Sequence, residues 1–466
     1  MKKTLMIVIL LLTGVFAQAQ SVWDGSRALW TRGTGSQDDP FLIESAAHLA
    51  YLSYMVGKGF NTSGLYFRLT TDIDLNGNED QQWIPIGLLG DAYYEDGCER
   101  NAVPVCLADR TDLYFKGHFD GDNHCIFNLY INKDRGVVGL FGMLGDSGDP
   151  ENPTVVENLF LMSGYVKGLT SGGIAGKGVS RNCLISRCLN GAMIEGNTAG
   201  GIVGGTADRV YNCNNIGSVY GSSCVGGIVG ETVNEIIECF NTGAVSGQGI
   251  GGGLLGGGLA MRNVRLENCY NSGEVSVTGT MAPNNIPQSP VGGLVGIAWL
   301  GGNNALTNSY NSGTVTAEVV EPGALVGSFK GEVTNSYYLN TCGGTGEGEP
   351  RTAEEMRDLA FVNVLNFETD VWCADTLNSN DGYPILGANN LSVGEQTLMT
   401  LKVYPNPTNG AFAVEGTGSL QVFDVLGQLV RVLEIHEKAT LELPQGMYFI
   451  RLDSENDTKL AKLVVR

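Results

Sequence analysis

Short apolar runs alternate with glycines in a pattern that recurs along the middle of the chain. Each repeat has a Gly-Gly-aliphatic stretch, such as GGIVG at Gly226, and then an aliphatic position before a Cys or Ser. The stretches begin at Gly172, Gly200, Gly226, Gly252, Gly292 and Gly323, at spacings of 28, 26, 26, 40 and 31 residues. Glycine is too frequent and the apolar runs are too short for helices. A period of this length is typical of solenoids and propellers.

Three short strands are predicted in each unit. The first is the Gly-Gly run, the second ends at the Cys/Ser position, and the third contains the valine after the next turn. Three residues before the Cys/Ser position every unit is aliphatic: Ile185, Val210, Ile236, Leu266, Leu306 and Val333. One unit cannot bury this apolar face alone, so units are expected to stack with equivalent strands ~4.8 Å apart. The pattern predicts an all-β parallel β-helix, because a propeller blade needs four longer strands.

The Cys/Ser position is predicted to form a ladder along the stack. It is occupied by Cys188, Cys213, Cys239, Cys269, Ser309 and Ser336. A position that accepts either residue favours mostly unpaired thiols, whereas Cys98 with Cys106 and Cys342 with Cys373 are better disulfide candidates. The residue before each Cys/Ser position is polar, which conflicts with strict strand alternation, so a bulge or bend is predicted there.

An asparagine recurs two residues after the Cys/Ser position in five units. These asparagines are Asn190, Asn215, Asn241, Asn271 and Asn311. Asparagine tolerates the left-handed conformation and its amide can hydrogen-bond to an identical neighbour. The sequence therefore predicts a corner residue that is bonded along the stack.

Helical segments are predicted to cap both ends of the repeats, since an open solenoid end exposes its core. IESAAHLAYLSYMV begins at Ser45 as N-cap, within a block at 20–135 read as a cap with the first coils. RTAEEMRDLAFVNVL begins with Thr352 and Glu355 as a capping box, within a C-terminal cap at 346–390. Trp372 and Tyr383 are expected to plug that end.

The chain begins with a predicted cleaved signal peptide at 1–19. MKK is a basic start, TLMIVILLLTGVF is an apolar run of signal-peptide length, and AQA ends at Ala19. The signal predicts export through the periplasm. The net charge of −21 over 466 residues disfavours nucleic-acid and membrane-surface partners, because an acidic surface repels phosphates.

Two families resemble parts of this sequence. GGLVG followed by NSYNSGTV, with its siblings at 136–345, resembles the GLUG motif of bacterial surface proteins, which carries no defined activity. After a linker at 391–397, residues 398–466 resemble the type A sorting domain of the Bacteroidetes type IX secretion system. The matching residues include Tyr404, Pro405, Asn406, Pro407, Gly410, Gly446 and Tyr448. This resemblance implies a small immunoglobulin-like β-sandwich, contact with the secretion machinery, and passage to the cell surface or the medium.

No catalytic residue and no cofactor is predicted. The four histidines form no HExxH motif. His118 and His124 bracket two aspartates, for which a glycine-rich turn is the simpler interpretation. Asp72, Asp74 and Asn76 match the first half of a calcium loop, but Trp83 stands where a bidentate Glu is needed, so they are only weak metal candidates.

A ligand corner is predicted where two neighbouring units carry longer links. From the last Gly of the Gly-Gly stretch to the Cys/Ser position the links are 12, 9, 9, 13, 13 and 9 residues long. Insertions in repeats form loops on one face, so the longer links should bring Met261, Arg262 and Trp299 together. Trp299 is read as a platform for a sugar or a partner's apolar side chain, or as a shield over the coil edge. The predicted function is a non-enzymatic adhesin or glycan-binding protein; the alternative is a β-helical polysaccharide-degrading enzyme.

Overall fold

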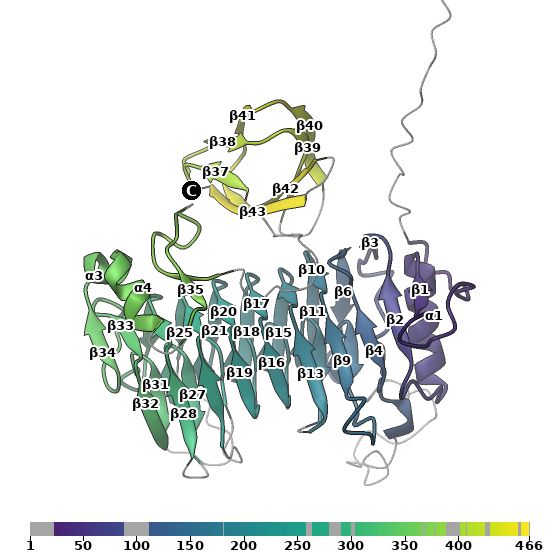
Figure 1. The fold of residues 1–466 in the computed structure, drawn as a ribbon, viewed down its shortest axis with the longest axis horizontal. Helices are drawn as coiled ribbons and strands as arrows, with labels where there is room; N and C mark the ends of the chain where they lie inside the picture. The colour runs from purple at the N-terminus through teal and green to yellow at the C-terminus, as the bar shows by residue number, and fades with distance from the viewer. Residues whose placement is uncertain are drawn as a thin grey trace, which may run out of the picture.

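Parallel β-structure dominates the computed structural model (Figure 1). It describes residues 23–87, 111–179, 181–257, 263–278, 290–299, 303–366, 369–376, 378–387, 401–406, 408–424, 429–454 and 458–465. Three long sheets run along one stack, and in the first two the strand order follows the order of the chain. Because each turn of the chain adds one strand to each sheet, the arrangement is consistent with the expected β-helix.

The first sheet holds the strand that precedes the Cys/Ser position. Its strands are β1 (Phe41–Ile43), β2 (Tyr66–Leu69), β4 (His118–Asp120), β9 (Thr154–Glu157), β13 (Cys183–Ser186), β16 (Arg209–Tyr211), β19 (Glu235–Ile237), β23 (Arg265–Glu267), β28 (Asn304–Thr307) and β32 (Gly331–Thr334). The predicted aliphatic position is in register throughout: Ile185 pairs with Val210, and Val210 pairs with Ile236. The prediction that equivalent residues stack is confirmed.

The second sheet holds the short strands that follow the Cys/Ser position. They are β3 (Ile73–Asp74), β5 (Cys125–Phe127), β10 (Phe160–Leu161), β14 (Leu189–Asn190), β17 (Asn214–Asn215), β20 (Phe240–Asn241), β24 (Tyr270–Asn271), β29 (Tyr310–Asn311), β33 (Tyr337–Leu339) and β34 (Glu349–Arg351). The bend between the first and second sheets is made by one residue with positive φ. That residue is Arg187, Asn212, Glu238, Asn268, Asn308 or Asn335, with φ between 45° and 55°. The predicted bend is therefore present, and it ends each first-sheet strand before the Cys/Ser position rather than at it.

In the third sheet, the strands differ from the prediction of three separate short strands in each unit. It contains β6 (Leu129–Asn132), β7 (Val137–Val138), β11 (Gly164–Gly172), β15 (Met193–Gly200), β18 (Val219–Gly226), β21 (Val245–Gly247), β22 (Ile250–Gly252), β25 (Val275–Val277), β26 (Val291–Gly292) and β30 (Val315–Ala317). In β15 and β18 the predicted third strand runs on into the first glycine of the next Gly-Gly stretch. The aliphatic residue after it makes a single bridge, as between Val203 and Val229. Two small parallel pairs, β8 (Phe141–Met143) with β12 (Ala175–Lys177) and β27 (Val295–Ala298) with β31 (Val326–Phe329), extend this corner.

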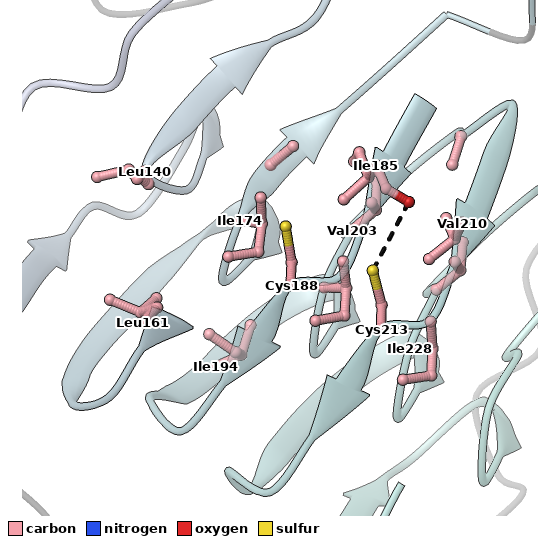
Figure 2. Packing of buried hydrophobic residues seen from close by; sticks show 14 of the residues in the cluster. Leu140, Leu161, Ile174, Ile185, Cys188, Ile194, Val203, Val210, Cys213 and Ile228 are labelled. Carbon is pink, nitrogen blue, oxygen red and sulfur yellow. Dashed lines mark hydrogen bonds between the residues drawn. The ribbon is translucent and has the colours of Figure 1, made fainter. Parts of the chain in front are cut away.

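Sulfur and hydroxyl groups form a buried ladder inside the stack, which we call the cysteine ladder: Cys188, Cys213, Cys239, Cys269, Ser309 and Ser336. The Sγ of Cys213 donates to the carbonyl of Ile185 over 3.6 Å, as Figure 2 shows. The amide of Cys213 donates to Sγ of Cys239 over 3.3 Å. The four cysteines of the ladder form no disulfide, as predicted. The predicted disulfide between Cys342 and Cys373 is wrong: Cys342 lies buried in the last coil, Cys373 is exposed, and both are free. Cys98 and Cys106 lie outside the described residues.

The asparagines also form a ladder, but not at a left-handed corner. Asn190, Asn215, Asn241, Asn271 and Asn311, the asparagine ladder, are fully buried in second-sheet strands and have no positive φ. Each of the first four donates Nδ2 to Oδ1 of the next, over 2.7 to 2.9 Å. Hydrogen bonding along the stack is thus confirmed, while the left-handed corner is wrong because the residue before the Cys/Ser position makes the turn.

The asparagine ladder explains the second glycine of the Gly-Gly stretch. A Cβ at Gly227 would lie 2.4 Å from Cγ of Asn241 and 2.1 Å from the carbonyl oxygen of Gly253. Only glycine allows the backbone to pass this closely over the buried amide. The repeated Gly-Gly and the repeated Asn are therefore two halves of one packing contact.

Helices lie near both ends of the stack (Figure 1). α1 (Ala46–Gly57) begins at Ser45, whose Oγ accepts from the amide of His48 over 3.2 Å, as predicted. The Thr352–Glu355 capping box is also present, but the helix breaks at Asp358 into α3 (Ala353–Arg357) and α4 (Leu359–Leu365), because Asp358 is extended and caps the second helix.

The C-terminal cap packs on aromatic rings that face outward from the second sheet. Trp372, in β35 (Trp372–Cys373) paired with β36 (Ile385–Leu386), and Tyr383 are both buried. Tyr270 and Tyr310 stack on each other at 5.2 Å, and Trp372 lies 5.5 Å from the Tyr310 ring. The predicted plugs therefore cover the side of the last coils.

Residues 401–465 form a separate antiparallel unit with its own core (Figure 1). One sheet holds β37 (Lys402–Tyr404), β38 (Ala411–Glu415) and β41 (Lys438–Glu442); the other holds β40 (Leu429–Ile435), β39 (Gly418–Asp424), β42 (Gly446–Asp453) and β43 (Thr458–Val465). The β-strands that the resemblance to the sorting domain implied for this segment are present. An immunoglobulin-like classification stays a prediction.

Candidate functional site

Trp299 follows β27 directly, and its side chain is 56% exposed. Such exposure is unusual for a tryptophan, whose apolar ring is normally covered. Met261 and Arg262 lie outside the described residues, as do the tips of both longer links. The convergence of the three residues therefore stays a prediction, and the described part of the site is an exposed ring at a strand end.

The weak metal candidates use their oxygens in protein hydrogen bonds. Oδ1 of Asp74 accepts from the amide of Asn76 over 2.7 Å and from Nδ2 of Asn128 over 2.8 Å. Asn76 has φ of 46°, so the segment is a strand followed by a turn. Within the described ranges no group of three or more His, Cys, Asp and Glu side chains is arranged to hold a metal ion.

Asp72 instead links two parts of the molecule. Its Oδ1 lies 3.2 Å from Nδ1 of His124 and accepts from the amide of Cys125 over 2.9 Å. Its Oδ2 pairs with Arg451 of β42, in the C-terminal unit. Burial works against the ionised form, but the bonds from His124, Arg451 and Cys125 outweigh it and lower the pKa of Asp72 to about 2.

A charged cluster on the outer face of the first sheet could not be assembled from the sequence. His118 Nε2 lies 2.7 Å from Oε1 of Glu157, and Oε2 of Glu157 pairs with Arg187. Burial opposes the ionised form, but the contacts with His118 and Arg187 outweigh it and lower the pKa of Glu157. Alongside, Arg68 Nε lies 3.3 Å from Oδ2 of Asp120.

The charged groups come from neighbouring coils, and the two nearby histidines have different carboxylate partners. His118 bonds to Glu157 and His124 bonds to Asp72, so the two histidines of the GHFDGDNHC segment do not share a ligand. Glu157 could have been placed near this cluster from the strand register, because it pairs with Asp120 on the adjacent strand. An oriented histidine beside a carboxylate and an arginine can bind an acidic group or transfer a proton.

The thiols of the cysteine ladder are held in their neutral form. Burial raises the pKa of the Cys269 thiol to about 12 and the pKa of Cys213 well above its ordinary value. Since the thiolate is the nucleophile, a thiol held neutral in this way is unreactive. These cysteines serve packing and hydrogen bonding.

The motif residues of the C-terminal unit lie around its strand ends. Lys438 Nζ donates to the Tyr404 hydroxyl over 2.8 Å, and Tyr404 also bonds to Glu415. The Tyr404–Pro405 peptide bond is cis. Asn406 follows β37, and Pro407 lies outside the described residues.

The glycines and the second tyrosine of this motif frame β38 and β42. Gly410 has φ of 127° just before β38, and Gly446 begins β42. Tyr448 is buried, and its hydroxyl donates to the carbonyl of Pro444 over 3.1 Å. A left-handed glycine at this point turns the chain into the strand, which explains its place in the motif.

Comparison with known proteins identifies the C-terminal unit. Residues 402–466 match the family model of a secretion system C-terminal sorting domain. The match implies a secreted protein of the Bacteroidetes type, exported through the type IX secretion system to the cell surface or the extracellular space. In the described residues no helix is both long and apolar enough to cross a membrane.

Part of the chain is similar to segments of two much larger proteins. A protein described as a Gly-rich membrane protein from Evansella cellulosilytica is 30% identical over 156 residues, 33% of this chain and 14% of that protein. Halomucin from Haloquadratum walsbyi is 30% identical over 175 residues, 37% of this chain and 2% of that protein. The chain thus spans a small part of either relative.

Proposed function

We propose that this protein is a surface-displayed β-solenoid of GLUG-like repeats that binds an extracellular glycan or cell-surface partner without catalysis. The observation that carries the proposal is a sorting domain joined to a rigid stack of parallel strands. The buried asparagines and cysteines of the two ladders bond along the stack, so the outer face is what the molecule offers to partners. Removal of a signal peptide at 1–19 and of the sorting domain after export belongs to the same proposal.

The exposed Trp299 supports a contact at the corner of the longer links. A large amphipathic ring fixed at a strand end loses little conformational entropy on binding, and such rings are common binding hot spots. If Trp299 contacts the ligand, Trp299→Ala should weaken attachment of the purified chain to cells or glycans about tenfold. Tyr54→Ala, which removes an exposed ring from α1, is the matched control.

Binding of the purified chain to cells and to immobilised glycans tests the proposal as a whole. Both variants must first show unchanged unfolding, since loss of the fold would also abolish attachment. Unchanged attachment of a folded Trp299→Ala protein removes this corner as the contact. Absence of attachment by the unaltered chain to any cell or glycan refutes the binding function.

A polysaccharide-degrading enzyme is the second candidate, and the His118–Glu157–Arg187 cluster is the observation that favours it. Glu157 would orient His118 as a base, and Arg187 would offset the charge of an acidic sugar. Steady release of reducing ends or unsaturated products, lost in Glu157→Gln, would replace the binding proposal with this one.

A further inference from the structure

The outer face of the third sheet carries a row of partly exposed side chains that neither the sorting domain nor the Trp299 corner uses. We define the tyrosine strip as Tyr130 of β6, Tyr165 of β11, Met193 of β15 and Tyr220 of β18. Tyr130, Tyr165 and Met193 are direct neighbours in register across adjacent strands. Tyr220 pairs with Glu195, so it lies two residues further along its strand than the other three, on the same face of the sheet. The next inward residues, Val166 and Ile194, are fully buried, so alternation directs the strip outward.

The strip keeps apolar surface open to solvent on a rigid support. Met193 is 45% exposed and begins β15, and Tyr220 is 38% exposed and is the second residue of β18, so both belong to strands rather than to loops. The rings of Tyr130 and Tyr165 lie 5.8 Å apart, centroid to centroid. The four strands span three strand spacings, roughly 14 Å, which suits an extended chain laid across the strands.

Hydrogen-bonding groups lie beside the rings, and their charges cancel. The Tyr165 hydroxyl donates to Oε2 of Glu195 over 2.7 Å, and Lys167 Nζ lies 2.8 Å from Oε1 of the same carboxylate. Nε2 of Gln248 donates to the Tyr220 hydroxyl over 3.2 Å. A positive and a negative side chain that neutralise each other attract neither an anionic nor a cationic ligand.

We infer that the tyrosine strip is a binding face for a neutral, extended polysaccharide. Sugar rings present apolar C–H faces together with hydroxyl groups, and half-exposed tyrosines flanked by amide and carboxylate groups match both. An acidic chain is disfavoured because the whole protein carries a net charge of −21. The inference rests on the proposed binding function and names its ligand class and its surface.

The test measures binding of the purified full chain to soluble neutral polysaccharides, namely a β-glucan, a xylan and a galactomannan, with a polyuronate for comparison. The double variant Tyr165→Ala with Tyr220→Ala should bind at least about tenfold more weakly, because both ring faces are lost. Tyr165→Phe with Tyr220→Phe keeps the rings and should stay within about threefold of the unaltered chain. Affinity should change little between low salt and 1 M salt, since no charge pairing is involved.

Tyr211→Ala is the matched control, because Tyr211 is a half-buried tyrosine on the first sheet, away from the strip. Tyr220→Ala alone serves as the second variant should the double variant unfold. Unchanged affinity in the folded alanine variants, or a loss equal to that of Tyr211→Ala, would show that the tyrosine strip is not the binding face. Preferential, salt-sensitive binding of the polyuronate overturns the neutral ligand.

The two levels of the proposal fail separately. If the unaltered chain binds none of the neutral polysaccharides but still attaches to cells, the inference is wrong and the proposed function stands. If the chain attaches to neither, both are wrong. Product release during the same incubations would point to the enzymatic alternative.

Discussion

Replacing Asn241 by alanine would break the middle of the asparagine ladder. The Asn241 side chain is fully buried and makes four hydrogen bonds. Nδ2 donates to Gly243 O and to Asn271 Oδ1, each over 2.8 Å, while Oδ1 accepts from Asn215 Nδ2 over 2.7 Å and from the amide of Gly243 over 3.2 Å. Alanine removes all four and leaves buried partners unsatisfied.

The expected cost follows from the number of lost bonds. At about 1 kcal/mol for each buried hydrogen bond, the free energy of opening the flanking coils should fall by about 4 kcal/mol. Since 1.4 kcal/mol is a factor of ten, opening should become on the order of a thousandfold more frequent. Asn190, at the end of the ladder, makes three such bonds, so Asn190→Ala should cost less.

Amide hydrogen exchange is the appropriate assay because repeat stacks open locally, and a single melting temperature would average over coils. Exchange should accelerate in β17, β20 and β24 and stay unchanged in the sorting domain. Asn197→Ala is the control: Asn197 is exposed and its Nδ2 bonds to Ser222 over 3.0 Å, so its loss should cost less than about 0.5 kcal/mol. If Asn241→Ala accelerates exchange no more than Asn197→Ala, the amide ladder does not stabilise the stack.

Three further outcomes are expected. Cys239→Ser should leave hydrogen exchange nearly unchanged, because serine fills the same ladder position in other coils. Cys239→Val leaves the Cys213 amide without its acceptor and should lower the free energy of opening by about 2 kcal/mol. Equal effects of the two substitutions would contradict a hydrogen-bonding role for the ladder. Because the pKa of Asp72 falls from 3.8 to about 2 on folding, its ionised form stabilises the fold above pH 4, and on the order of 2 kcal/mol of the free energy of unfolding is lost as the pH falls from 4 to 2. Urea unfolding of Asp72→Asn should lack this loss of stability. An acid dependence identical to that of the unaltered chain would refute the Arg451 contact. Deleting 398–466 should leave the protein in the periplasm by cell fractionation, and normal surface display of the truncated chain would contradict the sorting assignment.

Much of the core was predictable because each repeat imposes the same local constraints. The aliphatic position, the Cys/Ser position and the second glycine recur, and stacking places each beside its own copy. The N-caps at Ser45 and Thr352 were likewise predictable, since a cap depends on residues three positions apart.

Contacts between residues at different positions of the repeat could not be predicted from the sequence. Glu157 meets His118 over 2.7 Å and meets Arg187 in the next coil, although neither lies near it in the chain. The break of the C-terminal helix at Asp358 also escaped, because the apolar pattern continues across it. Such features depend on where the backbone bends and on which strands become neighbours.

The sequence by itself thus determined the repeat, its buried ladders and the helix caps, because these follow from spacing within the chain, and it indicated the sorting domain through its resemblance to a known family. Only the tertiary structure decided which residue makes each left-handed bend, and hence that Asn241 lies inside a strand rather than at a corner. It also decided which outward side chains become neighbours, as in the tyrosine strip. The physical reason is that a one-residue shift of a bend moves every following side chain to the opposite face, and no local pattern fixes that shift.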